Sequence, residues 1–222
     1  MKAPWIQVSV DTQDIPAALE HVAHAIAIDA EWVEVGTPLL TFAGIEAIGA
    51  VAEAAKGRTV LADFKALDGV AQYFQRAGEL GASVATVMAV ANESSIRTAI
   101  ASGHKAGVSV QVDMLGVPTE ELADRARQLA DMGADCFLLH LAIDKLTLHP
   151  DSDPLEGLDE LVAATDRPVG PVVFSAQQGV DAVRRGASYV VIGHPLINQP
   201  DARSLLLDFA TTVRSVKSEV PS

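Results

Sequence analysis

Three charged side chains stand close together in the segment Asp63-Phe64-Lys65-Ala66-Leu67-Asp68, which follows the apolar run Thr59-Val60-Leu61-Ala62. An extended strand points alternate side chains to one face, so Asp63 and Lys65 are predicted to project together at a strand end. Asp68 follows, where the next helix is expected to begin. Two acids and an ammonium gathered there are costly unless they pair with each other or with a ligand. We interpret the cluster as a candidate catalytic site, with a purely structural ion-pair network as the alternative.

The rest of the chain predicts the elements that position this cluster. Short β-branched runs alternate with alanine-rich segments of helical period, which is typical of βα units on a parallel sheet. Strands are predicted near Trp5–Asp11, Trp32–Val35, Thr59–Asp63, Ser83–Met88, Ser109–Leu115, Cys136–Leu141, Val169–Phe174 and Tyr189–Ile192. Helices are predicted at Ile15–Ile28, Gly44–Ala55, Val70–Leu80, Ser94–Ala106, Thr119–Met132, Leu155–Ala164, Ala176–Arg184 and Ala202–Val216.

Eight βα units in a chain of 222 residues predict an α/β fold, a (β/α)₈ TIM barrel, with residues 1–222 as a single domain. A doubly wound open sheet is the alternative, but no GxGxxG follows the first strand. A barrel builds its active site at the carboxyl ends of its strands. The polar residues predicted at those ends are Asp11, Glu34, Asp63, Lys65, Asp113, His140, Ser175 and the pair Gly193-His194.

The sequence resembles the orotidine-monophosphate decarboxylase superfamily, and within it the 3-hexulose-6-phosphate synthases and 3-keto-L-gulonate-6-phosphate decarboxylases. The resemblance covers nearly the whole chain and lies in four stretches: Glu34-Val35-Gly36-Thr37-Pro38-Leu39, Ala62-Asp63-Phe64-Lys65-Ala66-Leu67-Asp68-Gly69, Val112-Asp113-Met114-Leu115-Gly116, and His140 with Asp144. It implies a (β/α)₈ barrel that works as a homodimer with sites near the subunit interface. It also implies Mg²⁺ near Glu34 and Asp63, and proton handling by Lys65, Asp68 and His140 around an enediolate.

These roles agree with the chemistry of the side chains. A hard cation held by Glu34 and Asp63 could chelate a ketone and its neighbouring hydroxyl. Lys65 should stay protonated between two acids and stabilise the enediolate oxygen, and His140 suits proton transfer at neutral pH. Quenching of the enediolate by formaldehyde gives an aldol product, and quenching by a proton gives a decarboxylase outcome.

The sequence departs from the resembled family where the substrate phosphate is held. The family's glycine pair after strand seven is replaced by Phe174-Ser175-Ala176-Gln177-Gln178-Gly179, and its Gly-Arg after strand eight by Gly193-His194-Pro195. Helix N-termini at Ala176 and beyond His194 can still present amides to an anion. The predicted substrate-binding residues are therefore Asp11, Asp113, Asp144, Ser175, Ala176, Gly193 and His194.

The function predicted is a Mg²⁺-dependent carbon–carbon lyase that joins formaldehyde to ribulose 5-phosphate or cleaves the product. Ile143 stands where the decarboxylases tend to carry arginine, which favours the synthase over the decarboxylase. A decarboxylase of a 3-keto sugar-acid phosphate is the second enzymatic interpretation. A diverged, non-catalytic barrel that binds a small anion is the interpretation from another class.

Composition limits the partners. The formal net charge of −13 argues against nucleic-acid and anionic-membrane binding, because phosphates would be repelled. No secretory signal or membrane-length apolar run is present, so a cytoplasmic location is expected. The single cysteine, Cys136, lies in an apolar run and is interpreted as an inert core residue. An apolar patch around Leu67 and Val70 is expected to contribute to the dimer.

Overall fold

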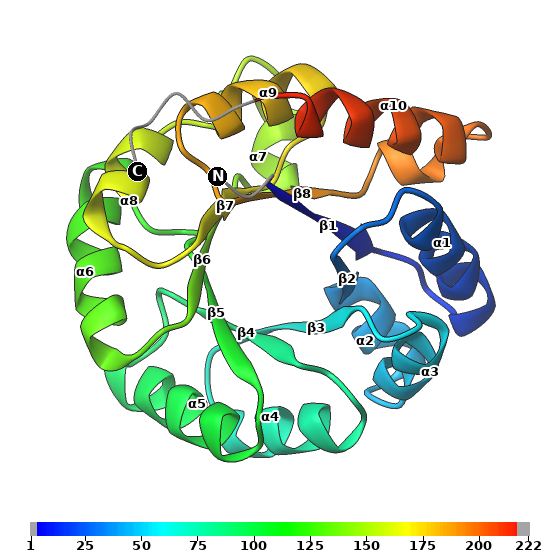
Figure 1. Ribbon diagram of the computed structural model, residues 1–222. Coiled ribbons are helices and arrows are strands. Elements are labelled where there is room, and N and C mark those ends of the chain that lie inside the picture. The colour runs from blue at the N-terminus through cyan, green and yellow to red at the C-terminus, as the bar shows by residue number, and fades with distance from the viewer. Residues whose placement is uncertain (1–3, 217–222) are drawn as a thin grey trace.

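The computed structural model describes residues 4–216, so the ends of the predicted domain, 1–3 and 217–222, lie outside the described residues. Eight parallel strands follow one another around a ring (Figure 1) in the order β7-β6-β5-β4-β3-β2-β1-β8. Their bounds are β1 Trp5–Val10, β2 Trp32–Val35, β3 Thr59–Ala66, β4 Val84–Met88, β5 Ser109–Asp113, β6 Cys136–Leu139, β7 Val169–Pro171 and β8 Tyr189–Ile192.

The ring closes between its first and last members. Val172, just after β7, pairs with Val191 of β8, and the Val173 amide donates to the Val191 carbonyl at 2.9 Å. The predicted (β/α)₈ TIM barrel is therefore confirmed. Several strands end earlier than predicted, as at β7, which stops at Pro171 rather than at Phe174.

Helices surround the strands as an outer ring (Figure 1). Those that return the chain from one strand to the next are α1 Ile15–Ala27, α3 Ala47–Ala54, α4 Val70–Glu79, α5 Glu93–Lys105, α6 Leu122–Met132, α8 Leu158–Ala164 and α9 Ala176–Arg184, and α10 Ala202–Arg214 follows β8. Three short elements that the sequence did not predict follow strand ends: α2 Thr37–Ala43, α7 Ile143–Leu148 and the 3₁₀ turn η2 Leu196–Asn198. A further 3₁₀ turn, η1 Thr119–Glu121, precedes α6. Within residues 4–216 no helix is both long and apolar enough to cross a bilayer.

Local sequence explains where the helices begin. In α1, Asp14 caps the helix by accepting a hydrogen bond from the Ala17 amide at 2.9 Å, and Pro16 stands in the first turn, where its missing donor costs nothing. Ala18 and Val22 lie one turn apart on the buried face. The same proline preference explains α2, because Pro38 lies in its first turn and starts the helix instead of breaking it.

Strand β3 differs most from its prediction, because it continues to Ala66 instead of ending at Asp63. Its pairing with β4 shifts register between Ala62 and Ala66, and Lys65 adopts a left-handed backbone with φ of 44°. The strand keeps Asp63 and Lys65 on the barrel side, while the Phe64 ring packs outward against rings of α4. The strand irregularity thus places the ammonium of Lys65 in the barrel mouth.

Candidate active site

A cavity of about 510 Å³ opens at the carboxyl ends of the strands and has two unlike sides. The polar wall, as we call it, consists of Ser9, Asp11, Glu34, Asp63, Lys65 and His140. The apolar wall consists of Leu138, Leu141, Ile143, Val172, Phe174 and Val191. Thr37, Pro38, Gly193 and His194 complete the lining. The cavity therefore has a charged side, where chemistry is possible, and a hydrocarbon side.

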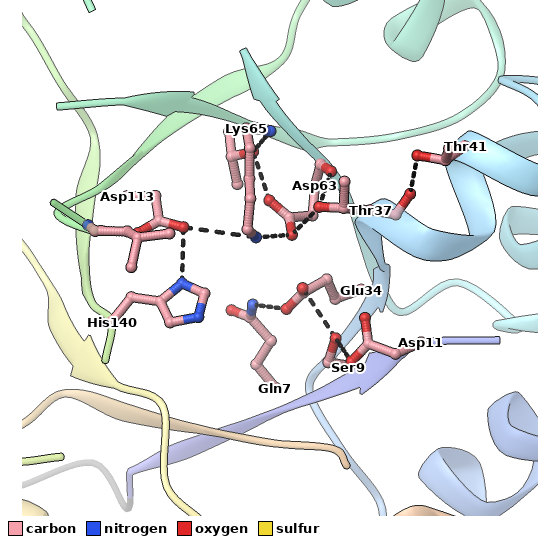
Figure 2. A network of polar contacts seen from close by, with 12 residues as sticks. Gln7, Ser9, Asp11, Glu34, Thr37, Thr41, Asp63, Lys65, Asp113 and His140 are labelled. Carbon is pink, nitrogen blue, oxygen red and sulfur yellow. Dashed lines mark hydrogen bonds and ion pairs between the residues drawn. The ribbon is translucent and has the colours of Figure 1, made fainter. Parts of the chain in front are cut away.

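Lys65 lies at the centre of an ion-pair network that joins β3, β5 and the end of β6 (Figure 2). Its ammonium donates to Asp63 Oδ2 and lies 3.6 Å from Asp113 Oδ2. The same Asp113 oxygen lies 2.9 Å from His140 Nδ1, and the other oxygen accepts the Leu115 amide at 2.9 Å. Asp113 is fully buried and holds both the Lys65 ammonium and the His140 ring in place.

The charges in this network stabilise one another. Burial alone lowers the pKa of Lys65, but the carboxylates of Asp63, Asp113 and Glu34 outweigh it and raise that pKa above its ordinary value. Burial likewise lowers the pKa of His140, yet Asp113 holds it above the usual value. For Asp113, burial raises the pKa, but His140 and Lys65 bring it below the ordinary value. The arrangement favours a charged ammonium beside a histidine that readily accepts a proton.

Glu34 forms a second polar group on β1 and β2. Gln7 Nε2 donates to Glu34 Oε2 at 2.6 Å, and Ser9 Oγ lies 2.9 Å from both Glu34 Oε1 and Asp11 Oδ2. Burial, followed by the charges of Asp63 and Asp11, raises the pKa of Glu34 to about 8. Burial also raises the pKa of Asp11. The Ser9 hydroxyl carries one hydrogen for these two acceptors, so it donates to one carboxylate at a time.

Four supporting residues were not predicted from the sequence. Thr37 Oγ1 donates toward Asp63 Oδ2 at 2.8 Å, and Thr86 Oγ1 donates to Asp63 Oδ1 at 2.8 Å while accepting the Lys65 amide at 2.9 Å. The other two are Gln7 and Ser9. Two signals could have found three of them. Gln7 and Ser9 alternate with Asp11, which directly follows β1, and Thr86 is a hydroxyl inside the otherwise apolar strand β4.

The structure does not bring every predicted site residue into the pocket. Glu34, Asp63, Lys65, His140, Asp11, Gly193 and His194 line it, and Asp113 lies directly behind Lys65. Asp68 is exposed, outside the lining, and accepts a 3.5 Å hydrogen bond from Ser95. Asp144 is exposed on α7, Ser175 caps α9, and Ala176 is the first residue of α9. The roles of all the predicted site residues, inside and outside the pocket, stay predictions.

Few side chains in the pocket could coordinate the predicted metal ion. Among the described residues, no group of three or more His, Cys, Asp or Glu is arranged to hold a metal ion. Mg²⁺, however, commonly binds through one or two carboxylates and keeps water or substrate oxygens as its other ligands. Glu34 and Asp63 meet that requirement. Asp63 and Asp11 both lie near enough to Glu34 to raise its pKa after burial has done so, and a divalent cation held there would offset this repulsion between like charges.

Comparisons with known proteins agree with this geometry. A 3-hexulose-6-phosphate synthase of Staphylococcus aureus is 33% identical over 153 residues, which are 69% of this chain and 70% of that protein. The crystal structure of 3-hexulose-6-phosphate synthase from Salmonella typhimurium is 27% identical, with a TM-score of 0.86 over 94% of this chain and 98% of the other. A 3-keto-L-gulonate-6-phosphate decarboxylase from Vibrio cholerae shares the fold, at 19% identity, with a TM-score of 0.81 over 96% of this chain and 97% of the other.

The family match itself extends over most of the molecule. The sequence model described as the Orotidine 5'-phosphate decarboxylase / HUMPS family matches residues 4–206, which include every strand of the barrel and all residues of both pocket walls. The resemblance inferred from the four motif stretches is therefore confirmed. This chain belongs to the Orotidine 5'-phosphate decarboxylase / HUMPS family.

Proposed function

We propose that the protein is a metal-dependent carbon–carbon lyase of the 3-hexulose-6-phosphate synthase type, acting on a keto-sugar phosphate or a close analogue. One observation carries the proposal: a charged Lys65 and a proton-accepting His140 share the buried carboxylate of Asp113 at the edge of one cavity. The relatives described as 3-hexulose-6-phosphate synthases support the same reaction type.

The side chains divide the reaction between them. His140 takes the proton from the carbon next to the substrate ketone, and the electron pair moves onto the ketone oxygen to give an enediolate. Lys65 stabilises the negative oxygen electrostatically, since Asp63 and Asp113 hold its ammonium in place before the substrate arrives. The enediolate carbon then attacks the carbonyl carbon of formaldehyde, so the new carbon–carbon bond forms as the π bond of formaldehyde breaks and the ketone re-forms. The former aldehyde oxygen takes the proton that His140 removed in the first step.

We propose Mg²⁺ as the cofactor, with Glu34 and Asp63 as the residues that would hold it. A bound divalent cation would polarise the ketone and the adjacent hydroxyl as a Lewis acid. The chain's own contribution is to orient its ligands, because Thr37 and Thr86 both donate to Asp63 and Gln7 donates to Glu34. Removal of metal by a chelator is expected to abolish turnover, and added Mg²⁺ to restore it.

The direct test is proton exchange followed by NMR. D-ribulose 5-phosphate is incubated in D₂O with protein and Mg²⁺, and the carbon-1 proton signals are followed. We expect one of the two carbon-1 protons to exchange stereospecifically, and formaldehyde then to yield a six-carbon product. Exchange confined to D-xylulose 5-phosphate would instead support the decarboxylase. Absence of exchange on any keto sugar, with or without phosphate, would contradict the proposal.

We also propose that the protein is a homodimer. Asp68 is exposed and does not line the pocket of its own protomer, and on the same segment Leu67 and Tyr73 are 53% and 43% exposed. Val70, expected in this patch, is instead in the core. Light scattering should give twice the 23.3 kDa chain mass, and Leu67→Lys should reduce it to the single chain. The cytoplasmic location stays a prediction.

A further inference from the structure

Three polar side chains lie inside the barrel without lining the pocket. They are Gln7 of β1, Gln111 of β5 and Tyr189 of β8, and none of them has any exposed surface. The interior of such a barrel is usually filled by branched aliphatic side chains. Buried polar groups are costly unless they are hydrogen-bonded, so three of them in contact indicate a role beyond packing. We call these three residues the amide relay.

The Tyr189 side chain is held in one orientation. Its ring stacks on Trp5, with centroids 5.1 Å apart and planes 2° apart, and a Cβ added at Gly170 would lie 2.4 Å from a ring carbon. Its hydroxyl oxygen lies 2.7 Å from the carbonyl oxygen of Phe137. Because a carbonyl carries no hydrogen, the Tyr189 hydroxyl has to donate to it. With its one hydrogen used there, Tyr189 Oη can only accept from its other neighbour.

Two side-chain amides pass this direction across the barrel. Gln111 Nε2 lies 2.9 Å from Tyr189 Oη and 3.4 Å from Gln7 Oε1, so its two hydrogens meet two acceptors. With its oxygen turned to Gln111, Gln7 has its NH₂ group on the side of Glu34, and Nε2 lies 2.6 Å from Glu34 Oε2 (Figure 2). The Phe137 carbonyl thus sets which end of Gln7 faces Glu34.

The orientation of Gln111 serves its neighbours more than itself. Among residues 4–216, Gln111 Oε1 is a buried acceptor with no hydrogen-bond partner, which costs free energy. The opposite orientation would place that oxygen against two acceptors. If Gln7 turned over in response, its own oxygen would face a Glu34 oxygen, and the two would repel each other. A donor held against Glu34 instead favours the ionised carboxylate, which is the form that binds a cation.

We propose that Gln111 and Tyr189 are positioning residues for Glu34, because they turn the Gln7 NH₂ group toward it and so hold its carboxylate ready for a divalent cation. The cation part rests on the proposed function, in which Glu34 holds Mg²⁺. Neither Gln111 nor Tyr189 lines the cavity, so both act through Gln7 and not on the substrate.

The direction of the relay is tested in metal-free protein. Tyr189→Phe removes the hydroxyl and keeps the aromatic ring, and Gln111→Leu removes the central amide. The Gln7 side-chain NH₂ signals, identified by their loss in Gln7→Leu, should exchange with water roughly three- to tenfold faster in both variants, as for loss of one hydrogen bond. Phe209→Leu, a buried change on α10, controls for general destabilisation and should leave these signals unchanged. Unaltered Gln7 exchange in both relay variants would overturn the proposal.

The consequence for the cation is tested by NMR titration of backbone amides with Mg²⁺. Tyr189→Phe and Gln111→Leu should each weaken Mg²⁺ binding by about tenfold, as for loss of a group that orients a metal ligand. The double variant should lose no more than either single variant, because either change already disconnects Gln7. Unchanged Mg²⁺ affinity in both single variants, or losses that add in the double variant, would overturn the positioning role.

Carbon-1 exchange on D-ribulose 5-phosphate separates this proposal from the proposed function. At limiting Mg²⁺ the exchange should be slower in Tyr189→Phe, and saturating Mg²⁺ should restore it, which a loss of folded structure would not allow. If the wild type gave no exchange while the Gln7 signals and Mg²⁺ affinities changed as expected, the relay would be supported and the lyase rejected. Wild-type exchange with unchanged Mg²⁺ affinity in both relay variants would support the lyase and reject the relay.

Discussion

The two walls of the cavity are held in place by different forces. The polar wall is a network in which each charge has a partner on another strand, as when Asp113 of β5 contacts both Lys65 of β3 and His140 after β6. The apolar wall has no such network, and Leu138 and Val191 are positioned by packing on Tyr189. A charge network places a few atoms accurately, and a packed hydrocarbon surface selects shape and polarity. The polar wall is therefore suited to catalysis, and the apolar wall to the selection of the substrate.

Lys65→Ala should have the largest effect, because it removes the one ammonium at the polar wall. We expect kcat/KM for carbon-1 exchange to fall by about 100-fold or more, as for loss of an oxyanion-stabilising donor. Circular dichroism and gel filtration check that the barrel survives. Lys145→Ala is the matched control, since Lys145 is exposed and outside the lining. Full turnover by a folded Lys65→Ala protein would mean that the polar wall is structural.

Leu138→Ala should affect stability rather than the chemical step. Leu138 is 3% exposed and packs on Tyr189 and Val191, so its truncation should lower the free energy of unfolding by about 2–3 kcal/mol. Urea denaturation measures this, and Leu207→Ala, at a 51% exposed position, should change it by less than about 0.5 kcal/mol. If Leu138→Ala slowed carbon-1 exchange strongly but left the free energy of unfolding unchanged, the apolar wall would take part in the chemical step.

Asp113→Asn tests the connection inside the polar wall. Loss of the carboxylate should lower the pKa of His140, because Asp113 is what holds that pKa above its usual value. General acid–base catalysis contributes roughly 10²–10⁴-fold, so a mismatched histidine should slow exchange by about tenfold. Histidine ring signals in an NMR titration report the pKa, and Asp144→Asn, on exposed α7, is the control. An unmoved His140 pKa would show that the two residues are not coupled.

Glu34→Gln tests the second polar group through a pH dependence of stability in metal-free protein, where the metal-binding role of Glu34 does not enter. The pKa of Glu34 is about 8 in the folded chain against an ordinary 4.5, so the folded state binds more protons between these values. Stability of the wild type therefore falls as pH rises from about 4.5 to about 8. Glutamine does not titrate, so the advantage of the variant in urea denaturation should grow across this window and then level off.

Two additions complete the Glu34 experiment. The exposed Glu53→Gln is its control and should show no such trend. Added Mg²⁺ should narrow the difference between Glu34→Gln and the wild type, because the cation would stabilise the ionised carboxylate. A constant difference across the pH window would mean that Glu34 ionises normally.

Much of the polar wall could be predicted because the barrel obeys simple rules. Parallel strands of a barrel end on one rim, so Glu34, Asp63 and His140 could be placed together from their positions at strand ends alone. The alternation of side chains along a strand predicted that Lys65 would lie on the same face as Asp63. Its exact position depends on the register shift between β3 and β4, which no local sequence pattern indicated. The partners Thr37 and Thr86 could not be paired with Asp63, because strand register sets those contacts.

By itself, the sequence determined the architecture and the chemical inventory of this protein, since hydrophobic periodicity specifies βα units and charged residues at strand ends are visible in the chain. Only the tertiary structure raised the pKa of Glu34 above its ordinary value, because that pKa depends on burial and on neighbours from other strands. It also decided that Asp68 lies outside its own pocket. The apolar wall also depends on the tertiary structure. In the sequence, Leu138, Phe174 and Val191 look like ordinary core residues, and closure of the barrel brings them together in the lining of one cavity.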